Sequence, residues 1–141
     1  MKIRDVMTPN PRTVSPDDTI QTAARIMQAE DTGAVPVVSN GQVLAVVTDR
    51  DIVVRVVAEG VSPDSRVLDI ATIDVICASP EMSTREASEL MSEHQIRRLP
   101  VVENDMLVGI VSLGDLAVKE NKDSRSGDTL EKISEGVKEQ V

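Results

Sequence analysis

The chain has 141 residues, of which 40% are hydrophobic and 28% charged, and its formal net charge is −9 at pH 7. This composition is typical of a globular protein, and the acidic balance argues against nucleic acid or an anionic membrane as a partner. Because there is no Phe, Tyr or Trp, the aromatic platforms that stack single-stranded bases are also absent. No apolar run could span a bilayer, and the first residues lack the apolar core of a signal peptide, so we expect a cytoplasmic location.

The first half of the chain predicts a strand, a helix, a β-hairpin and a second helix. A short strand precedes the first helix, which is predicted from Thr19 to Glu30 by apolar residues at three- and four-residue spacing, with Asp18 or Thr19 as its N-cap. Two apolar runs follow, Ala34 to Val38 and Val43 to Val47, and the Asn-Gly pair between them is typical of a hairpin turn. The last helix is predicted from Asp49 to Glu59, where a glycine ends it.

The same order of elements returns 64 residues later without a gap, so that Asp51 aligns with Asp115 and Met27 with Met91. The corresponding elements of the second copy are a helix from Ser83 to His94, strands from Leu99 to Val102 and from Leu107 to Val111, and a helix from Leu113 to about Lys119.

We therefore expect a mixed α/β (α+β) fold of two repeats related by a pseudo-twofold axis. Each repeat should contain a three-stranded sheet and two helices in the order β-α-β-β-α, with the first repeat at residues 1–60 and the second at 61–120. A single copy is too small to bury its sheet, so the copies should pack sheet to sheet. Residues 121–141 are expected to be a polar linker and a short helix, Thr129 to Val137, which is either frayed or docked on a dimer partner.

Segments of both copies resemble the signature segments of the cystathionine-β-synthase (CBS) domain, whose tandem pair is called a Bateman module. They are Asp5-Val6-Met7-Thr8, Ala45 to Asp51, Arg97 to Val102 and Gly109 to Asp115. The resemblance extends from about Ile3 to about Lys119 and includes the order, spacing and duplication of the segments. Similar pairs are regulatory parts of inosine-monophosphate dehydrogenase and of the gamma subunit of AMP-activated kinase, and short prokaryotic proteins consist of the pair alone. The resemblance implies a regulatory module that binds adenine nucleotides in clefts between the repeats.

A hydroxyl residue followed three positions later by an aspartate comes directly after each predicted hairpin. The pairs are Thr48 with Asp51 and Ser112 with Asp115. A hydroxyl and free N–H groups at a helix N-terminus suit a phosphate, and the carboxylate can accept ribose hydroxyls. An isolated pair of this kind is more often only a helix cap. Its recurrence at the same repeat position favours nucleotide binding, although capping and binding can both hold.

Two basic residues, Arg97 and Arg98, stand where the resemblance implies contacts with ligand phosphates, just before the strand that begins at Leu99-Pro100. Guanidinium groups suit bidentate phosphate binding, which would offset the repulsion by the acidic chain. An intersubunit ion pair or a solvated strand end is the alternative interpretation.

The first repeat departs from this pattern in two ways. It has Gly33 and Ala34 in place of the arginine pair, so Arg50 would have to supply its phosphate contact. It also has Ala45 where the second repeat has Gly109, and that methyl group could obstruct the approach of a ligand. We expect the two sites to differ, and one could be empty.

The resemblance implies an adenine pocket between the first strand and the hairpin of each copy, lined by aliphatic side chains and made specific by backbone amides. The residues concerned are Thr13, Val14 and Val35 in the first copy and Ile76, Cys77, Ala78 and Leu99 in the second. Pro100, which follows Leu99, is also expected among the ligand-binding residues.

The chain contains one histidine, His94, and one cysteine, Cys77, with no catalytic or metal-binding constellation around either. We therefore expect no enzyme activity, no metal site and no obligatory cofactor, with Mg²⁺ arriving only on a polyphosphate such as ADP or ATP. The expected partners are an adenine nucleotide (AMP, ADP, ATP or a relative), a second copy in a homodimer, and an unidentified protein target. The alternatives are a dimeric scaffold that binds no ligand, and an enzyme acting on a nucleotide.

Overall fold

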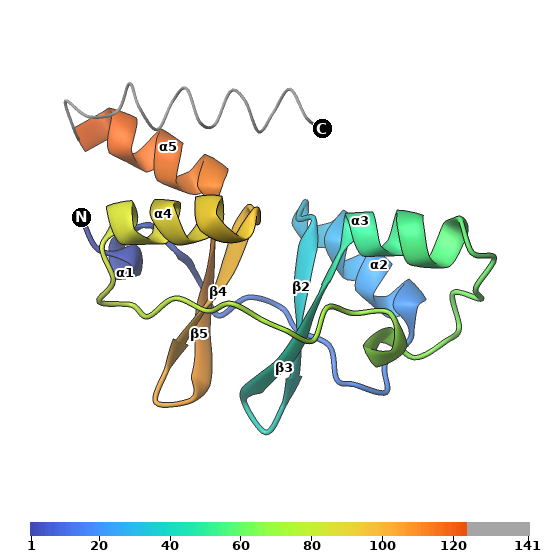
Figure 1. The fold of residues 1–141 in the computed structure, drawn as a ribbon. Coiled ribbons are helices and arrows are strands. Elements are labelled where there is room, and N and C mark those ends of the chain that lie inside the picture. The colour runs from blue at the N-terminus through green and yellow to red at the C-terminus, as the bar shows by residue number, and fades with distance from the viewer. Residues whose placement is uncertain (124–141) are drawn as a thin grey trace. The chain divides into compact units, whose positions relative to one another are not determined.

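The computed structural model describes residues 1–123 of the chain as short helices and small sheets (Figure 1). The elements before the repeat boundary are α1 (Ile3–Val6), β1 (Thr8–Pro9), α2 (Ile20–Glu30), β2 (Ala34–Ser39), β3 (Gln42–Thr48), α3 (Asp49–Asp51) and the π-helix η1 (Ile52–Val57). Those after it are the 3₁₀-helix η2 (Val67–Asp69), α4 (Thr84–His94), β4 (Arg98–Glu103), β5 (Met106–Ser112) and α5 (Leu113–Asp123). The expected mixed α/β class is confirmed.

The chain folds into two compact units whose limits cross those of the sequence repeats. Among the described residues, unit 1 contains Met1–Asn10, Ile76–Asn104 and residues 108–123. Unit 2 contains Pro11–Val75 and Asp105–Leu107. Each unit therefore combines the helices and strands of one repeat with the N-terminal segment of the other repeat.

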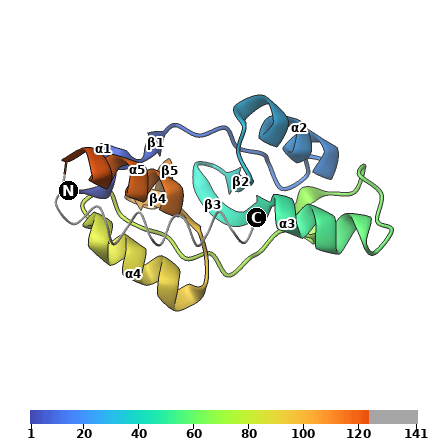
Figure 2. The same cartoon turned by 90° about the horizontal axis from the view of Figure 1, so that it is seen from above.

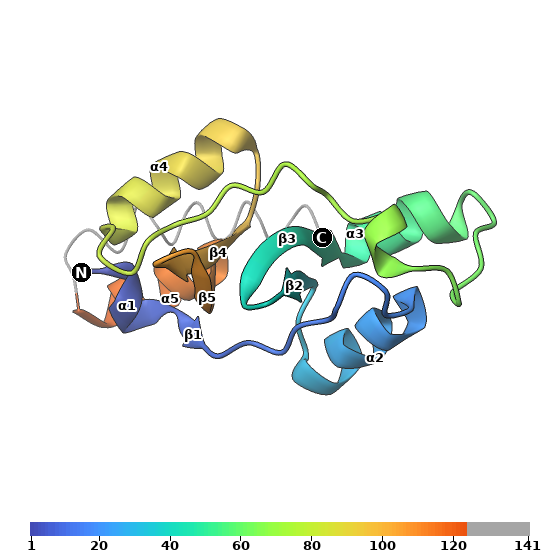
Figure 3. The same ribbon diagram turned by 90° about the horizontal axis from the view of Figure 1, so that it is seen from below.

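The helices α2 and α4 begin within one residue of the predicted starts, each after a hydroxyl residue that caps it. Thr19 Oγ1 accepts the Thr22 N–H at 3.1 Å, and Ser83 Oγ accepts the Glu86 N–H at 3.0 Å. Each helix ends at a residue in the left-handed conformation, which turns the chain toward the following strand. In unit 1, α5 contacts both α1 and α4, and α1 lies beside α5 in the views from above and from below (Figures 2 and 3).

Both predicted hairpins are present. β2 pairs antiparallel with β3 in unit 2, and β4 adjoins β5 in a sheet with the order β1-β5-β4. Asn40 and Gly41 have φ of 52° and 80° in the first turn, and Asn104 and Asp105 have φ of 52° and 64° in the second. Positive φ at both central residues is the geometry that joins strands of normal twist, and Asn, Asp and Gly adopt it most easily.

The predicted first strand of each copy is reduced to a single bridge. Val14 lies parallel to Val37, and Ala78 lies parallel to Val101. Two residues later each segment reaches a proline, which cannot donate a ladder hydrogen bond, so the extended stretch ends there. The expected three-stranded sheet of each repeat is therefore a hairpin with a bridged edge.

The last helix of each copy also differs from the expectation. After α3 the chain continues as a π-helix, in which the Ala58 N–H donates to the Val53 carbonyl at 3.0 Å. This stretch is rich in β-branched Val and Ile, which crowd a regular α-helix. α5 extends beyond Lys119 to Asp123, so the predicted linker is helical at its start. The predicted helix from Thr129 to Val137 lies outside the described residues.

Residues 2–9 and 66–73, here called the exchange segments, make equivalent contacts in the two units. The Ile3 N–H donates to the Met82 carbonyl and the Val67 N–H to the Asp18 carbonyl, both at 2.8 Å. These donors and acceptors occupy the same positions in the two repeats. The agreement continues at the other end of the segments, where Thr8 pairs with Ile110 and Thr72 pairs with Val46.

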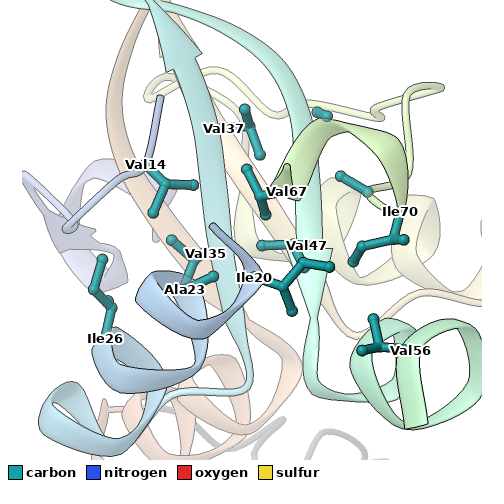
Figure 4. Close-up of a cluster of buried hydrophobic side chains, with 12 residues drawn as sticks. Val14, Ile20, Ala23, Ile26, Val35, Val37, Val47, Val56, Val67 and Ile70 are labelled. Carbon is teal, nitrogen blue, oxygen red and sulfur yellow. The ribbon is translucent and has the colours of Figure 1, made fainter. Parts of the chain in front are cut away.

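Each unit has its own hydrophobic core, and Figure 4 shows that of unit 2. Its buried members are Val14, Ile20, Ala23, Ile26, Val35, Val37, Ala45, Val47, Val56, Val67, Ile70 and Ala71. The core of unit 1 contains Ile3, Val6, Ala78, Ala87, Met91, Leu99, Val101, Val111, Leu113 and Leu116. In both cores the exchange segment supplies fully buried anchors, each worth about 1.5–3 kcal/mol for a Val or Ile. Over residues 1–123, no helix combines the length and the hydropathy needed to cross a membrane.

Candidate ligand site in each repeat

The two predicted hydroxyl–carboxylate pairs have the same geometry at the start of the last helix of each copy. Thr48 Oγ1 accepts the Asp51 N–H at 3.1 Å, and Asp51 Oδ2 accepts the Thr48 N–H at 2.9 Å. In unit 1 the corresponding distances are 3.0 Å from the Asp115 N–H to Ser112 Oγ and 3.3 Å from the Ser112 N–H to Asp115 Oδ2. Each pair is a capping box, so helix capping is confirmed at both positions.

The carboxylate of Asp51 is buried, with 8% of the residue exposed. Its second oxygen, Oδ1, lies 3.8 Å from Arg55 Nε, and Arg55 Nη1 donates a 3.2 Å hydrogen bond to the Ile70 carbonyl. A buried carboxylate needs hydrogen bonds or an opposite charge, and here it has both. Arg55 was not among the predicted site residues, although the four-residue spacing from Asp51 is a signal that could have identified it.

A backbone hydrogen bond ties each of these helix starts to the residue that precedes the hairpin. The Leu113 N–H donates to the Arg97 carbonyl at 2.8 Å, and in unit 2 the Asp49 N–H donates to the Gly33 carbonyl at 2.9 Å. This contact brings Arg97 to the N-terminus of α5, next to Ser112. Arg98 follows at the start of β4, and both arginines are partly buried.

In unit 2 the predicted phosphate contact, Arg50, is exposed within α3, between Asp49 and Asp51. Two carboxylates therefore flank it along the chain, whereas glycine and alanine occupy the positions equivalent to Arg97 and Arg98. The two units thus carry different charges around otherwise equivalent helix starts.

Several of the residues predicted to surround an adenine belong to the hydrophobic cores. The side chains of Val14, Val35, Ala78 and Leu99 are buried there. Pro100, which was predicted only as a ligand-binding residue, is buried in β4. The backbone N–H groups of Val14 and Ala78 are also used, because they donate to proline carbonyls of the neighbouring strand at 3.0 and 2.9 Å.

The remaining members of that predicted pocket are accessible. Thr13 is exposed in unit 2, and Ile76 and Cys77 are partly buried in unit 1. Their contact with a base stays a prediction. Burial raises the pKa of the Cys77 thiol, so the group is protonated at neutral pH and is a poor nucleophile.

The contrast between Gly109 and Ala45 suggested that the glycine leaves space for a ligand, but the structure shows that it does not. A Cβ at Gly109 would lie 2.5 Å from Met7 Sδ and 3.0 Å from the Thr8 carbonyl oxygen, so the glycine accommodates the exchange segment. Ala45 is fully buried in the core of unit 2, which also contains Ala71, the residue equivalent to Met7. The interpretation of Ala45 as an obstacle to a ligand is therefore wrong.

His94 is exposed at the C-terminal end of α4, where a helix terminus favours a positive charge. In the part of the chain that the structure describes, no group of three or more His, Cys, Asp or Glu residues could hold a metal ion.

Comparison with known proteins agrees with the duplication and the fold. The family model described as "CBS domain" matches residues 3–58 and 67–120. A CBS domain-containing protein of Bacillus subtilis, YhcV, is 44% identical over 132 residues, which cover 94% of each chain. The chain belongs to the CBS domain family, as a tandem pair of these domains.

Solved structures place the fold in the same family. A CBS-domain-containing protein of Agrobacterium tumefaciens has a TM-score of 0.77 and 33% identity, with coverage of 86% of this chain and 99% of that one. The CBS domain pair of protein MJ0100 has a TM-score of 0.80 and 24% identity, with coverage of 88% and 98%. That pair was solved in complex with 5′-methylthioadenosine and S-adenosyl-L-methionine.

Proposed function

We propose that this chain is a regulatory module that binds an adenine nucleotide, AMP, ADP, ATP or a relative, and that transmits binding through a homodimer or a protein target. The observation that carries the proposal is the hydroxyl–carboxylate pair at the same helix start in both repeats, accompanied in unit 1 by Arg97 and Arg98. Both ligands of the MJ0100 pair contain an adenosine group, which supports the ligand class.

In unit 1 the proposed roles follow from the chemistry of the groups. The Ser112 hydroxyl and the positive end of the α5 helix dipole favour a phosphate, and the guanidinium groups of Arg97 and Arg98 would neutralise it. The bond from the Ser112 N–H orients the Asp115 carboxylate, which would accept ribose hydroxyls. Cys77 and Ile76 would contact the base. Magnesium would enter only with a polyphosphate, and no other cofactor is required.

The surface of η1 supports self-association. Val53, Val54 and Val57 are 60%, 48% and 70% exposed, and their spacing places them on one side of the helix. Clustered exposed valines are unfavourable in water and are typical of protein–protein contacts. We propose that this face contributes to a homodimer interface or to the contact with a protein target, and that the module works in the cytoplasm.

A dimeric scaffold without a ligand is the second candidate function. It is favoured by the capping boxes, because capping alone accounts for Thr48, Asp51, Ser112 and Asp115. Under this proposal the exposed valines would be the functional surface, and the helix starts would contribute to stability only.

The melting temperature, followed by circular dichroism, tests the two proposals. A ligand at one hundred times its dissociation constant should stabilise the folded chain by about 2.7 kcal/mol, which raises the melting temperature by several degrees. We expect this shift with AMP, ADP or ATP, and a smaller one with GTP. Asp115→Asn should reduce this rise in melting temperature. Ser83→Ala, which removes the N-cap of α4, should leave the rise unchanged. No shift with any adenine ligand at millimolar concentration would favour the scaffold.

A further inference from the structure

We propose that side-chain size determines which exchange segment each repeat accepts. In one unit the large Met7 is matched with Gly109, and in the other the small Ala71 is matched with Ala45. Met7 and Ala71 are equivalent residues of the two segments, and Gly109 and Ala45 are equivalent residues of the strands that receive them. This inference concerns the assembly of the fold and is independent of the proposed ligand.

Most contacts of the two exchange segments cannot tell one segment from the other. The backbone hydrogen bonds of Ile3 and Val67 are the same length, and the backbone pairings of Thr8 and Thr72 are equivalent. Each segment also begins with a basic residue, Lys2 or Arg66, that pairs with an acidic residue before the long helix of its unit. Selectivity must therefore come from the positions at which the segments differ.

The size match is the clearest of these differences. In unit 1 a large side chain lies against a residue without a side chain, since a Cβ at Gly109 would come within 2.5 Å of Met7 Sδ. In unit 2 two methyl-bearing residues, Ala45 and Ala71, share the buried core. Placing the first segment on unit 2 would force Met7 against the methyl of Ala45, whereas the second segment on unit 1 would leave a void beside Gly109.

The fourth residue of the first segment acts in the same direction. Arg4 Nη2 lies 2.6 Å from Glu81 Oε1 and 3.2 Å from Glu103 Oε2. Its equivalent is Leu68, which packs against the core of unit 2. An exchange of the segments would bring Arg4 to an apolar contact and would leave Glu81 and Glu103 opposite a leucine. These ion pairs are exposed, so the size match is the stronger of the two effects.

A double-mutant cycle on the full chain tests the proposal, with the unfolding equilibrium constant measured in urea by circular dichroism. Gly109→Ala should increase this constant about 10- to 100-fold in the natural background, as expected for overpacking. In the Met7→Ala background the same change should have a clearly smaller effect, because the clash with the Met7 side chain is gone and only the 3.0 Å approach of the methyl group to the Thr8 carbonyl oxygen remains.

The reciprocal cycle uses unit 2. Ala71→Met should be strongly destabilising when Ala45 is present and much less so together with Ala45→Gly, which recreates the pair found in unit 1. Folding of a double variant whose single variant does not fold would also support the size match. If the effects of the two substitutions were additive in either cycle, the proposal would be overturned.

Discussion

The guanidinium group of Arg55 lies 3.8 Å from the buried carboxylate of Asp51 and donates a 3.2 Å hydrogen bond to the Ile70 carbonyl. The Arg55 side chain thus links the helix start that carries a candidate ligand residue, Asp51, to the exchange segment of unit 2. Asp51 is therefore oriented from two directions, by the Thr48 N–H and by Arg55.

We expect Arg55→Met to destabilise the chain by about 1–2 kcal/mol, because it leaves the buried Asp51 without an opposite charge and the Ile70 carbonyl without a donor. The half-exposed position of Arg55 keeps the loss below that of a fully buried ion pair. Urea unfolding provides the measurement. Arg85→Met is the matched control, because Arg85 pairs with Glu89 at 3.3 Å on an exposed helix face and should contribute close to zero. Equal effects of the two substitutions would contradict the role of Arg55.

Removing the hydroxyl of either capping box should cost about 0.5–2 kcal/mol, since the N–H of the third helical residue loses its acceptor. This applies to Thr48→Ala and to Ser112→Ala, while Thr48→Ser and Ser112→Thr should be nearly neutral because they keep the oxygen. Unfolding free energies of the four variants provide the check. Alanine variants as stable as the natural chain would show that these hydroxyls do not act as caps.

The pKa of Glu81 is lowered below its ordinary value, chiefly by the hydrogen bond from Lys2 and then by that from Arg4. A lowered pKa means that the charged form is favoured in the folded state. Its contribution to stability is present above the ordinary glutamate pKa and is lost as the pH falls through the lowered value. We expect the difference in melting temperature between the natural chain and Glu81→Gln to shrink as the pH is lowered from 6 toward 3. A difference that does not depend on pH would contradict this linkage.

Leu99 was considered as a ligand contact, but its side chain is fully buried in the core of unit 1. We expect Leu99→Ala to destabilise the chain by about 2–5 kcal/mol, as measured by urea unfolding. Ile73→Ala is the control, since Ile73 is 70% exposed and should lose little. A loss of ligand affinity without a loss of stability in Leu99→Ala would instead favour the contact with a ligand.

Burial raises the pKa of the Cys77 thiol, so the reactive thiolate is scarce at pH 7. We expect iodoacetamide to alkylate Cys77 more slowly in the folded chain than in urea, with the difference growing smaller as the pH approaches the raised pKa. A mass-spectrometric time course measures this directly. Faster alkylation in the folded chain would indicate an activated cysteine and would reopen the question of an enzyme.

The elements that depend on local sequence could be predicted. The helices α2 and α4 follow from apolar spacing and a single capping residue, and the hairpins follow from turn residues that accept positive φ. The capping boxes could be predicted for the same reason, since all their atoms lie within four residues of the chain. The π-helix could not, because β-branched residues show that a regular helix is unfavourable without showing what replaces it.

Features that depend on distant residues were missed. Aligning the repeats shows that residues 5–8 correspond to 69–72, but it does not show on which repeat either segment packs. Gly109 was interpreted as space for a ligand because Met7, which fills that space, is far away along the chain. Several predicted adenine contacts are core residues for a related reason: burial against the exchange segment is a tertiary property that a strand pattern does not contain.

The pairing of Thr8 with Ile110 also has consequences for how the chain acquires its structure. During synthesis Thr8 emerges about one hundred residues before its partner Ile110, so unit 1 can be completed only after the second hairpin has left the ribosome. Such non-local pairing raises the contact order and slows folding. A cut between the repeats would place each exchange segment and its acceptor strand on different fragments, so neither fragment alone could complete either unit.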